Sequence, residues 1–229
     1  MSTDRLRIIA AATLFSTGGA AIKATTLTGW QVASFRSGLA ALAVFLLVPA
    51  ARRGWSRRVA LVSVVYAVTM VLFVSSNKAT TAANAIFLQS TAPLYILVLA
   101  PLLLKEHVRR SDYVTMAALA VGLVLVVVGL PAASATAPNP VLGNGLALAS
   151  GVSWALTLMG LRWLGATEGG TSSTLATVVG GNALAFLLCL PFALPVAGAT
   201  VADAAVVGYL GFVQIGLAYV LMTRGISGV

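Results

Sequence analysis

Charged residues are scarce in this chain. Of its 229 residues, only 8% are charged, whereas 59% are hydrophobic, and the mean hydropathy is +1.01. A soluble domain usually carries about a quarter charged residues, so these side chains are too few to cover a water-exposed surface. The scarcity of charge therefore excludes an ordinary soluble domain.

Residues that bind metals, form disulfides or act as acids are scarcer still. The chain has five Asp and Glu residues, one histidine and one cysteine. A disulfide within the chain is excluded, and Cys189 lies in an apolar run, where a small core residue is expected. His107 lies in a basic loop, and the sequence holds no His/Cys pair and no phosphate-binding glycine loop. We therefore expect no enzyme, no metal and no cofactor.

What the chain does contain is long apolar runs. An apolar run of about 18 residues can cross the hydrocarbon core of a bilayer as a helix. Lipid cannot satisfy backbone polar groups, and the alternation of barrel strands is absent, so each run predicts a transmembrane helix. The predicted fold is an all-α, polytopic transmembrane helical bundle. Its eight predicted helices span residues 6–24, 30–51, 59–76, 80–104, 113–130, 142–161, 171–191 and 204–222.

The basic residues predict the orientation. With a cytoplasmic N-terminus, the outer side receives only Lys23 and Lys78. Lys and Arg concentrate in cytoplasmic loops, so we predict a multi-pass protein of a bacterial inner membrane. This topology also explains the net charge of +9 without nucleic acid. The basic residues on the cytoplasmic side are then Arg5, Arg7, Arg52, Arg53, Arg57, Arg58, Lys105, Arg109, Arg110, Arg162 and Arg224.

The two halves of the chain resemble each other weakly. The segment GLAALAVFLLVP at 38–49 resembles GNALAFLLCLP at 181–191. Because five helices per half is an odd number, a second copy would enter the membrane upside down, as in many secondary transporters. We predict inverted five-helix repeats, the first at 1–131 and an incomplete second at 140–229. Eight of ten helices would then be present.

Four features, in their order and spacing along the chain, resemble the EamA branch of the drug/metabolite transporter superfamily. They are the first-helix segment 14–23, Arg36, the stretch 82–129 with Pro93 and the pair Lys105-Glu106, and the segment 218–229 at the end of the eighth helix. The resemblance implies a ten-helix secondary transporter, of which the last two helices are lacking here. It also implies export as the direction of transport.

Arg36 is the one charge predicted at membrane depth. It lies seven residues inside Gly29, which is about 10 Å along a helix. A charge at that depth costs several kcal/mol unless it is paired or reaches water. Two interpretations stay open. Arg36 faces a water-filled cavity and binds a substrate carboxylate through two hydrogen bonds, or it reaches outward or bonds to helix carbonyls.

Other polar and aromatic residues at membrane depth are candidates for lining a substrate cavity, with packing between helices as the alternative for each. Pro93, one turn after Gln89, can open the helix locally. Glu106 is expected to form an ion pair that pins the cytoplasmic loop, so both receive a gating or structural role. The cavity candidates beside Arg36 are Ser16, Thr17, Tyr66, Asn84, Gln89, Tyr95, Trp154, Gln214 and Tyr219.

The predicted function is the carriage of small metabolites by alternating access, with amino acids first because of Arg36. All five carboxylates lie at helix ends or in loops, which argues for facilitated or weakly coupled transport. The alternative is a truncated, non-transporting membrane scaffold. The expected partners are a small-molecule substrate and the lipid bilayer, with a homodimer left open and no nucleic acid.

Overall fold

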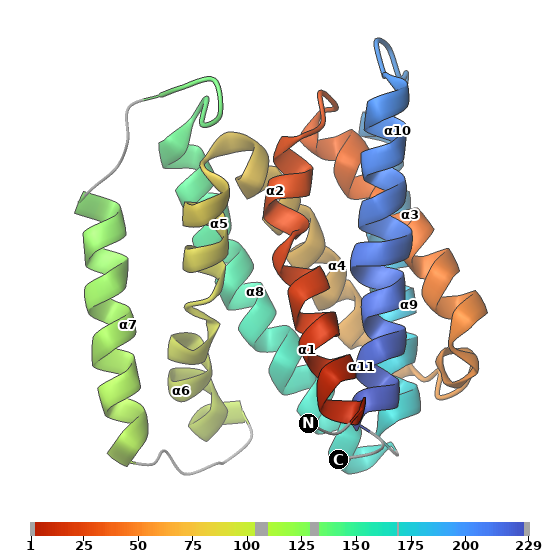
Figure 1. Cartoon of the computed structure of the whole chain (residues 1–229). Helices are drawn as coiled ribbons and strands as arrows, with labels where there is room; N and C mark the ends of the chain where they lie inside the picture. Colours follow the sequence, from red (N-terminus) through yellow and green to blue (C-terminus); the bar gives the residue numbers. More distant parts are fainter. Residues whose placement is uncertain (1–2, 104–109, 129–132, 169, 227–229) are drawn as a thin grey trace.

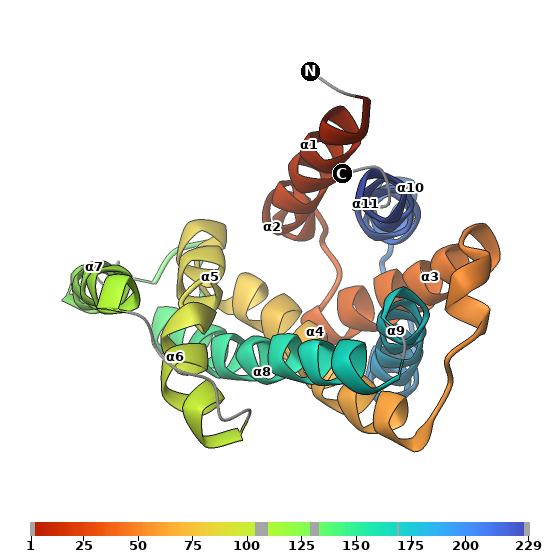
Figure 2. The same cartoon turned by 90° about the horizontal axis from the view of Figure 1, so that it is seen from below.

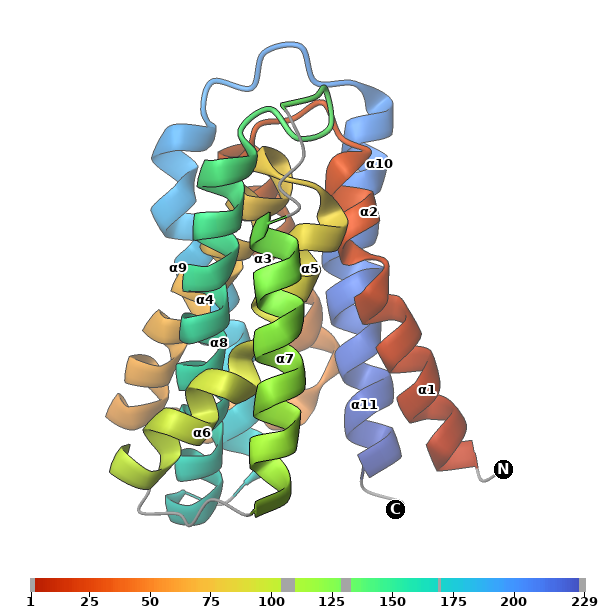
Figure 3. The ribbon, with the colours of Figure 1, turned by 90° about the vertical axis from the view of Figure 1, so that its left-hand side faces the viewer.

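The computed structural model describes the chain except residues 1–2, 104–109, 129–132, 169 and 227–229. The described helices run side by side as a bundle (Figures 1 and 3). The predicted all-α bundle is thereby confirmed. In chain order the helices are α1 (Thr3–Ser16), α2 (Gly18–Lys23), α3 (Gly29–Leu47), η1 (Pro49–Arg52), α4 (Arg57–Ala79), α5 (Ala82–Gln89), α6 (Ala92–Leu103), α7 (Arg110–Val128), α8 (Pro140–Thr167), α9 (Thr171–Ala193), α10 (Val201–Gly208), η2 (Tyr209–Leu217) and α11 (Ala218–Ile226).

Six spans among the described residues are long and apolar enough to cross a membrane, which makes the chain a multi-pass membrane protein. The predicted helix at 6–24 is not among them, and a break at Thr17 divides it into α1 and α2. Within α7 the apolar stretch is the shorter Met116–Leu125. The six spans are Gly29–Leu47, Arg57–Ala79, Ala82–Leu103, Pro140–Thr167, Thr171–Ala193 and Val201–Gly225.

Hydroxyl side chains fix where several helices begin. At the start of α3, the hydroxyl of Thr28 accepts a hydrogen bond from the Gln31 amide, and the Gln31 side chain accepts one from the Thr28 amide. Ser56 accepts from the Val59 amide at the start of α4. Such caps satisfy amides that the first helical turn leaves unpaired. The loops can therefore stay short without unpaired backbone groups.

Two antiparallel helix pairs, α3–α9 and α4–α8, make up the centre of the bundle, and α4 also packs against α9. On one side of this centre, α1 packs against α11 and η2 (Figure 2). On the other side, α5 and α6 pack against α8, and α7 lies at the edge beside α6. Cys189 is fully buried in a core cluster with Ile22 and Val32.

Three of the predicted continuous helices are interrupted. Besides the break at Thr17, α5 ends at Gln89 and α6 begins at Ala92. Pro93 therefore lies in the first turn of α6, not in mid-helix, and a first turn tolerates a residue without an amide hydrogen. Between α10 and α11 the chain forms the π-helix η2, in which each amide bonds five residues back rather than four.

Gly211 allows η2 to approach α3 closely. A Cβ atom at this position would lie 2.4 Å from Leu39 Cβ and 3.1 Å from the carbonyl oxygen of Arg36. Small residues at such crossings let helix backbones meet in membranes. The backbone of η2 thus lies directly against the turn of α3 that carries Arg36.

Gly211→Ala is expected to lower the free energy of unfolding by about 1–3 kcal/mol, because the added methyl group overpacks the α3–η2 crossing. The measurement is thermal unfolding of the purified protein in detergent. Gly208→Ala is the matched control, since nothing lies within 4 Å of a Cβ there. It should be neutral or stabilise by up to about 1 kcal/mol through helix propensity. Equal effects of the two substitutions would contradict the close crossing.

Candidate functional site

Arg36 is buried at the centre of the bundle with most of its hydrogen-bonding capacity unused. It is 2% exposed, and its Nη2 donates to Met70 Sδ at 3.4 Å. Its Nε and Nη1 have no partner. The described ion pairs are Arg7–Asp4 and Arg58–Glu168, so Arg36 is paired with neither carboxylate. In this structure the side chain neither reaches outward nor bonds to helix carbonyls.

One tyrosine, Tyr66, lies near Arg36, and it contacts a second tyrosine and an asparagine in turn. Tyr66 on α4 is close enough to Arg36 to interact with it electrostatically. The hydroxyls of Tyr66 and Tyr219 are 3.5 Å apart, and Asn182 Nδ2 donates to the Tyr66 hydroxyl at 3.3 Å. Asn182 is fully buried, and its Oδ1 has no partner. We call Arg36, Tyr66, Asn182 and Tyr219 the central polar cluster.

The break at Thr17 brings the first predicted span next to this cluster. The Phe15 ring packs edge-on against Tyr219, with centroids 5.4 Å apart, and the Phe15 carbonyl accepts a bond from Gln214 Nε2 at 3.3 Å. Gln214 Oε1 has no partner. The Thr17 hydroxyl lies 2.7 Å from that of Tyr209, so it links α1 to η2.

The remaining candidates divide between the cluster and the edge of the bundle. Trp154 packs against the buried core that contains Tyr66 and Tyr219. Gln89 Nε2 instead donates to Ser150 Oγ at 2.9 Å, which is a contact between α5 and α8. Tyr95 lies near Gly151 of α8, and Asn84 is half-buried on α5. Ser16 and Pro93 are exposed, and the Ser16 hydroxyl bonds to the Thr13 carbonyl. Glu106 lies outside the described residues.

The sequence analysis did not select two residues that lie at the candidate site. Asn182 bonds to Tyr66, and Met70 accepts the hydrogen bond from Arg36. Asn182 is an amide at membrane depth, which is the signal that could have found it, since burying an unpaired amide is costly. Met70 carries no such signal, because methionine is an ordinary residue of apolar helices.

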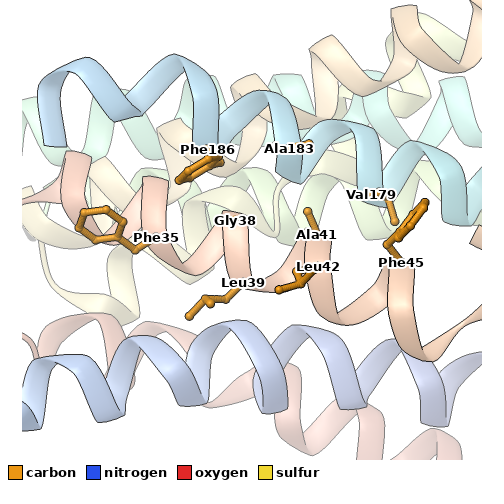
Figure 4. Close-up of a pocket in the computed structure, with 9 residues that line it drawn as sticks. All are labelled: Phe35, Gly38, Leu39, Ala41, Leu42, Phe45, Val179, Ala183 and Phe186. Carbon is orange, nitrogen blue, oxygen red and sulfur yellow. The ribbon is translucent and has the colours of Figure 1, made fainter. Parts of the chain in front are cut away.

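A hollow between α3 and α9 lies apart from the central polar cluster. It has a volume of about 520 Å³, and apolar side chains line it throughout. Figure 4 shows Phe35 and Phe45 towards its two ends, with Gly38 and Phe186 between them. Phe45 is 40% exposed, so the hollow opens on the outer, lipid-facing surface of the bundle. Without a polar group it cannot orient a polar solute, and none of the predicted site residues lines it.

Comparison with known families settles the class of the protein. The model of the EamA-like transporter family matches residues 6–128. The chain belongs to this family. The resemblance seen in the sequence is thereby confirmed, and this EamA-like protein is a membrane transporter of the drug/metabolite superfamily.

A solved structure shares the fold. Its title reads only "Crystal structure of protein", and it is 19% identical to this EamA-like chain with a TM-score of 0.66. The similarity covers 98% of this chain and 80% of that chain. At such low identity it shows the fold alone. No curated protein matches the sequence.

The contact between Gln89 and Ser150 predicts a measurable coupling between α5 and α8. In a double-mutant cycle of Gln89→Leu and Ser150→Ala, followed by thermal unfolding, we expect a coupling of about 0.6 kcal/mol, which is typical of hydrogen bonds between membrane helices. Gln89→Leu combined with Thr157→Val is the control and should be additive. Additivity in the first cycle would mean that the Gln89 amide is free to face a cavity instead.

Proposed function

We propose that this EamA-like transporter carries small metabolites with a carboxylate group, amino acids first, across a bacterial inner membrane by alternating access. Export is the direction that the family resemblance favours. The carriage of a solute rather than a scaffolding role rests on one observation. This observation is Arg36, a buried guanidinium with two unpartnered nitrogens.

The state of Arg36 favours a ligand with an anionic oxygen. An unpaired charge buried away from water costs several kcal/mol, and a charge inside a membrane protein is by default a functional candidate. A carboxylate matches the planar fork of a guanidinium with two parallel hydrogen bonds. Its arrival would satisfy the donors that are unpartnered in this structure.

Two acceptors favour a zwitterion over a simple anion. Asn182 Oδ1 and Gln214 Oε1 are buried without partners. An ammonium group carries only donors, so amide oxygens are suitable partners for it. A solute that carries both a carboxylate and an ammonium group offers a partner to each kind of unpartnered atom, and an amino acid is a small solute of this kind.

The helix contacts support alternating access between two repeats. In the predicted repeat the first, second and third helices correspond to the sixth, seventh and eighth. The contact of α4 with α8 then corresponds to that of α11 and η2 with α1, and the contact of α3 with η2 corresponds to that of α9 with α4. Contacts that exchange in this way are expected of inverted repeats that rock about a shared site.

The described ends of the chain support the proposed orientation. The N-terminus of α1 and the C-terminal end of α11 lie at the same end of the bundle (Figure 1). The α3–α4 connection, with Arg52 and Arg53, reaches that end as well, whereas Lys23 ends α2 at the other. The arginine-rich end is therefore assigned to the cytoplasm.

Arg36→Met tests the proposed substrate class. Without ligand, the variant should unfold at the same temperature as the parent or higher, because an unpaired buried charge is replaced by an apolar side chain. An amino acid at about 100 times its dissociation constant stabilises the parent by about 2.7 kcal/mol, and the variant should lose this stabilisation. The measurement is a thermal-shift screen of amino acids, with Arg36→Lys as the control that keeps charge but not the fork.

The corresponding amines without a carboxylate should not distinguish the parent from Arg36→Met. Amino-acid stabilisation that survives in Arg36→Met would contradict a carboxylate site at Arg36. If no solute stabilises the parent and proteoliposomes show no uptake, the non-transporting scaffold is the better description.

A further inference from the structure

Glu168 links the C-terminal end of α8 to the start of α4. Its Oε2 accepts a hydrogen bond from Ser56 Oγ at 2.5 Å, and its Oε1 lies 3.8 Å from Arg58 Nε. The guanidinium of Arg58 also lies over the Trp163 ring, 5.1 Å from its centroid. These contacts join two helices that are distant in the sequence.

The carboxylate of Glu168 does not stabilise its own helix, α8. A carboxylate at the C-terminus of α8 lies at the negative end of the helix dipole, where negative charge is unfavourable. The same carboxylate lies beside the first turn of α4, whose unpaired amides attract negative charge. Ser56 is the N-cap of that turn. Glu168 therefore acts on α4, across the helix interface.

Asp203 makes a similar link at the opposite end of the bundle. It is 2% exposed, and its Oδ1 accepts from the Thr26 amide at 2.7 Å, while its Oδ2 accepts from the Thr26 hydroxyl at 2.8 Å. Lys78 Nζ donates to the carbonyl and the hydroxyl of Thr25, at 2.7 and 2.8 Å. The segment between α2 and α3 is thus tied to both α10 and α4.

Capping alone does not account for the contacts of Asp203. Within α10, Thr200 and Asp203 already satisfy each other through the capping box, with Asp203 Oδ2 accepting from the Thr200 amide and hydroxyl. The two bonds from Thr26 are additional, and they join residues at opposite ends of the chain. They hold the segment after α2 against α10.

The two links occupy corresponding places in the predicted repeat. Each combines an N-cap hydroxyl, Ser56 or Thr200, with a carboxylate. The Glu168 contacts join the start of the third predicted helix, α4, to the end of the sixth, α8. The Asp203 contacts join the start of the eighth predicted helix, α10, to the segment that follows the end of the first, α2. Because α4 begins at one end of the bundle and α10 at the other (Figure 1), the two links close opposite ends.

We propose that these contacts are two latches, which we name the Glu168 latch and the Asp203 latch, and that transport opens them alternately. The proposal rests on alternating access as the proposed function. Rocking of one repeat against the other must separate α4 from α8 at one end or α10 from α2 at the other. Each latch lies across one of these separations, so its strength sets how often that end opens.

Cysteine reporters about three helical turns from each carboxylate test the latches. In a Cys189→Ala background, Gln214→Cys lies on the same helix as the Asp203 latch, and Thr157→Cys lies on the same helix as the Glu168 latch. Both positions are buried in this structure. The readout is the rate of labelling by a membrane-impermeant maleimide in lipid nanodiscs, where both ends of the protein are accessible.

Thr26→Val should raise the labelling rate of Gln214→Cys about tenfold, the effect of losing one hydrogen bond to a charged group. It should leave Thr157→Cys unchanged or slower. Glu168→Ala should raise the labelling rate of Thr157→Cys and leave that of Gln214→Cys unchanged or lower. Thr26→Ser, which keeps the hydroxyl, should restore slow labelling of Gln214→Cys and thereby show that the effect comes from the hydrogen bond.

Thr28→Val is the matched control, because Thr28 lies at the same end but caps only its own helix. It should change neither rate. Equal effects of Thr26→Val and Thr28→Val, or no effect of Thr26→Val, would overturn the Asp203 latch. No effect of Glu168→Ala on Thr157→Cys would overturn the Glu168 latch. Labelling needs no substrate, so these outcomes are independent of the test at Arg36.

Discussion

Lipid offers a peptide group no hydrogen-bond partner, and this constraint underlies the whole structure. Helices satisfy the hydrogen bonds of the backbone internally, and the caps at Thr28 and Ser56 satisfy amides where two helices begin. The same constraint applies to side chains, and many polar side chains of the helices bond to a carbonyl of their own helix or to a neighbouring helix. The buried side-chain atoms of Arg36, Asn182 and Gln214 that are left without partners are therefore informative. In the proposed function they are the groups available to bind a solute.

The order of the helices and six of the eight predicted spans could be predicted from the sequence, because a membrane-spanning helix needs an apolar run of a definite length. The interruptions could not. The break at Thr17 and the π-helix η2 arise where helices cross closely, as at Gly211, and such crossings depend on partners far along the chain. Pro93 did indicate a disturbed helix, but the break precedes it and leaves the proline in the following first turn.

The candidate site was predictable only in part, for a related reason. Depth along a helix can be read from the sequence, and it identified Arg36. The face on which a residue lies could not be read, because these helices are apolar all round and lack the periodicity that marks a buried face. Tyr66 thus lies near Arg36 and contacts Tyr219, whereas Gln89 bonds to Ser150 at a contact between α5 and α8.

The close crossing of η2 and α3 has a mechanical consequence. A Cβ atom at Gly211 would lie 3.1 Å from the carbonyl oxygen of Arg36, the residue whose guanidinium has two unpartnered nitrogens. Because no side chain separates Gly211 from the α3 backbone at this crossing, a displacement of η2 would be passed to the turn of α3 that carries Arg36. In the proposed function, a solute bound to the guanidinium would act on the same turn of α3. Solute binding and the position of η2 would then be coupled through α3.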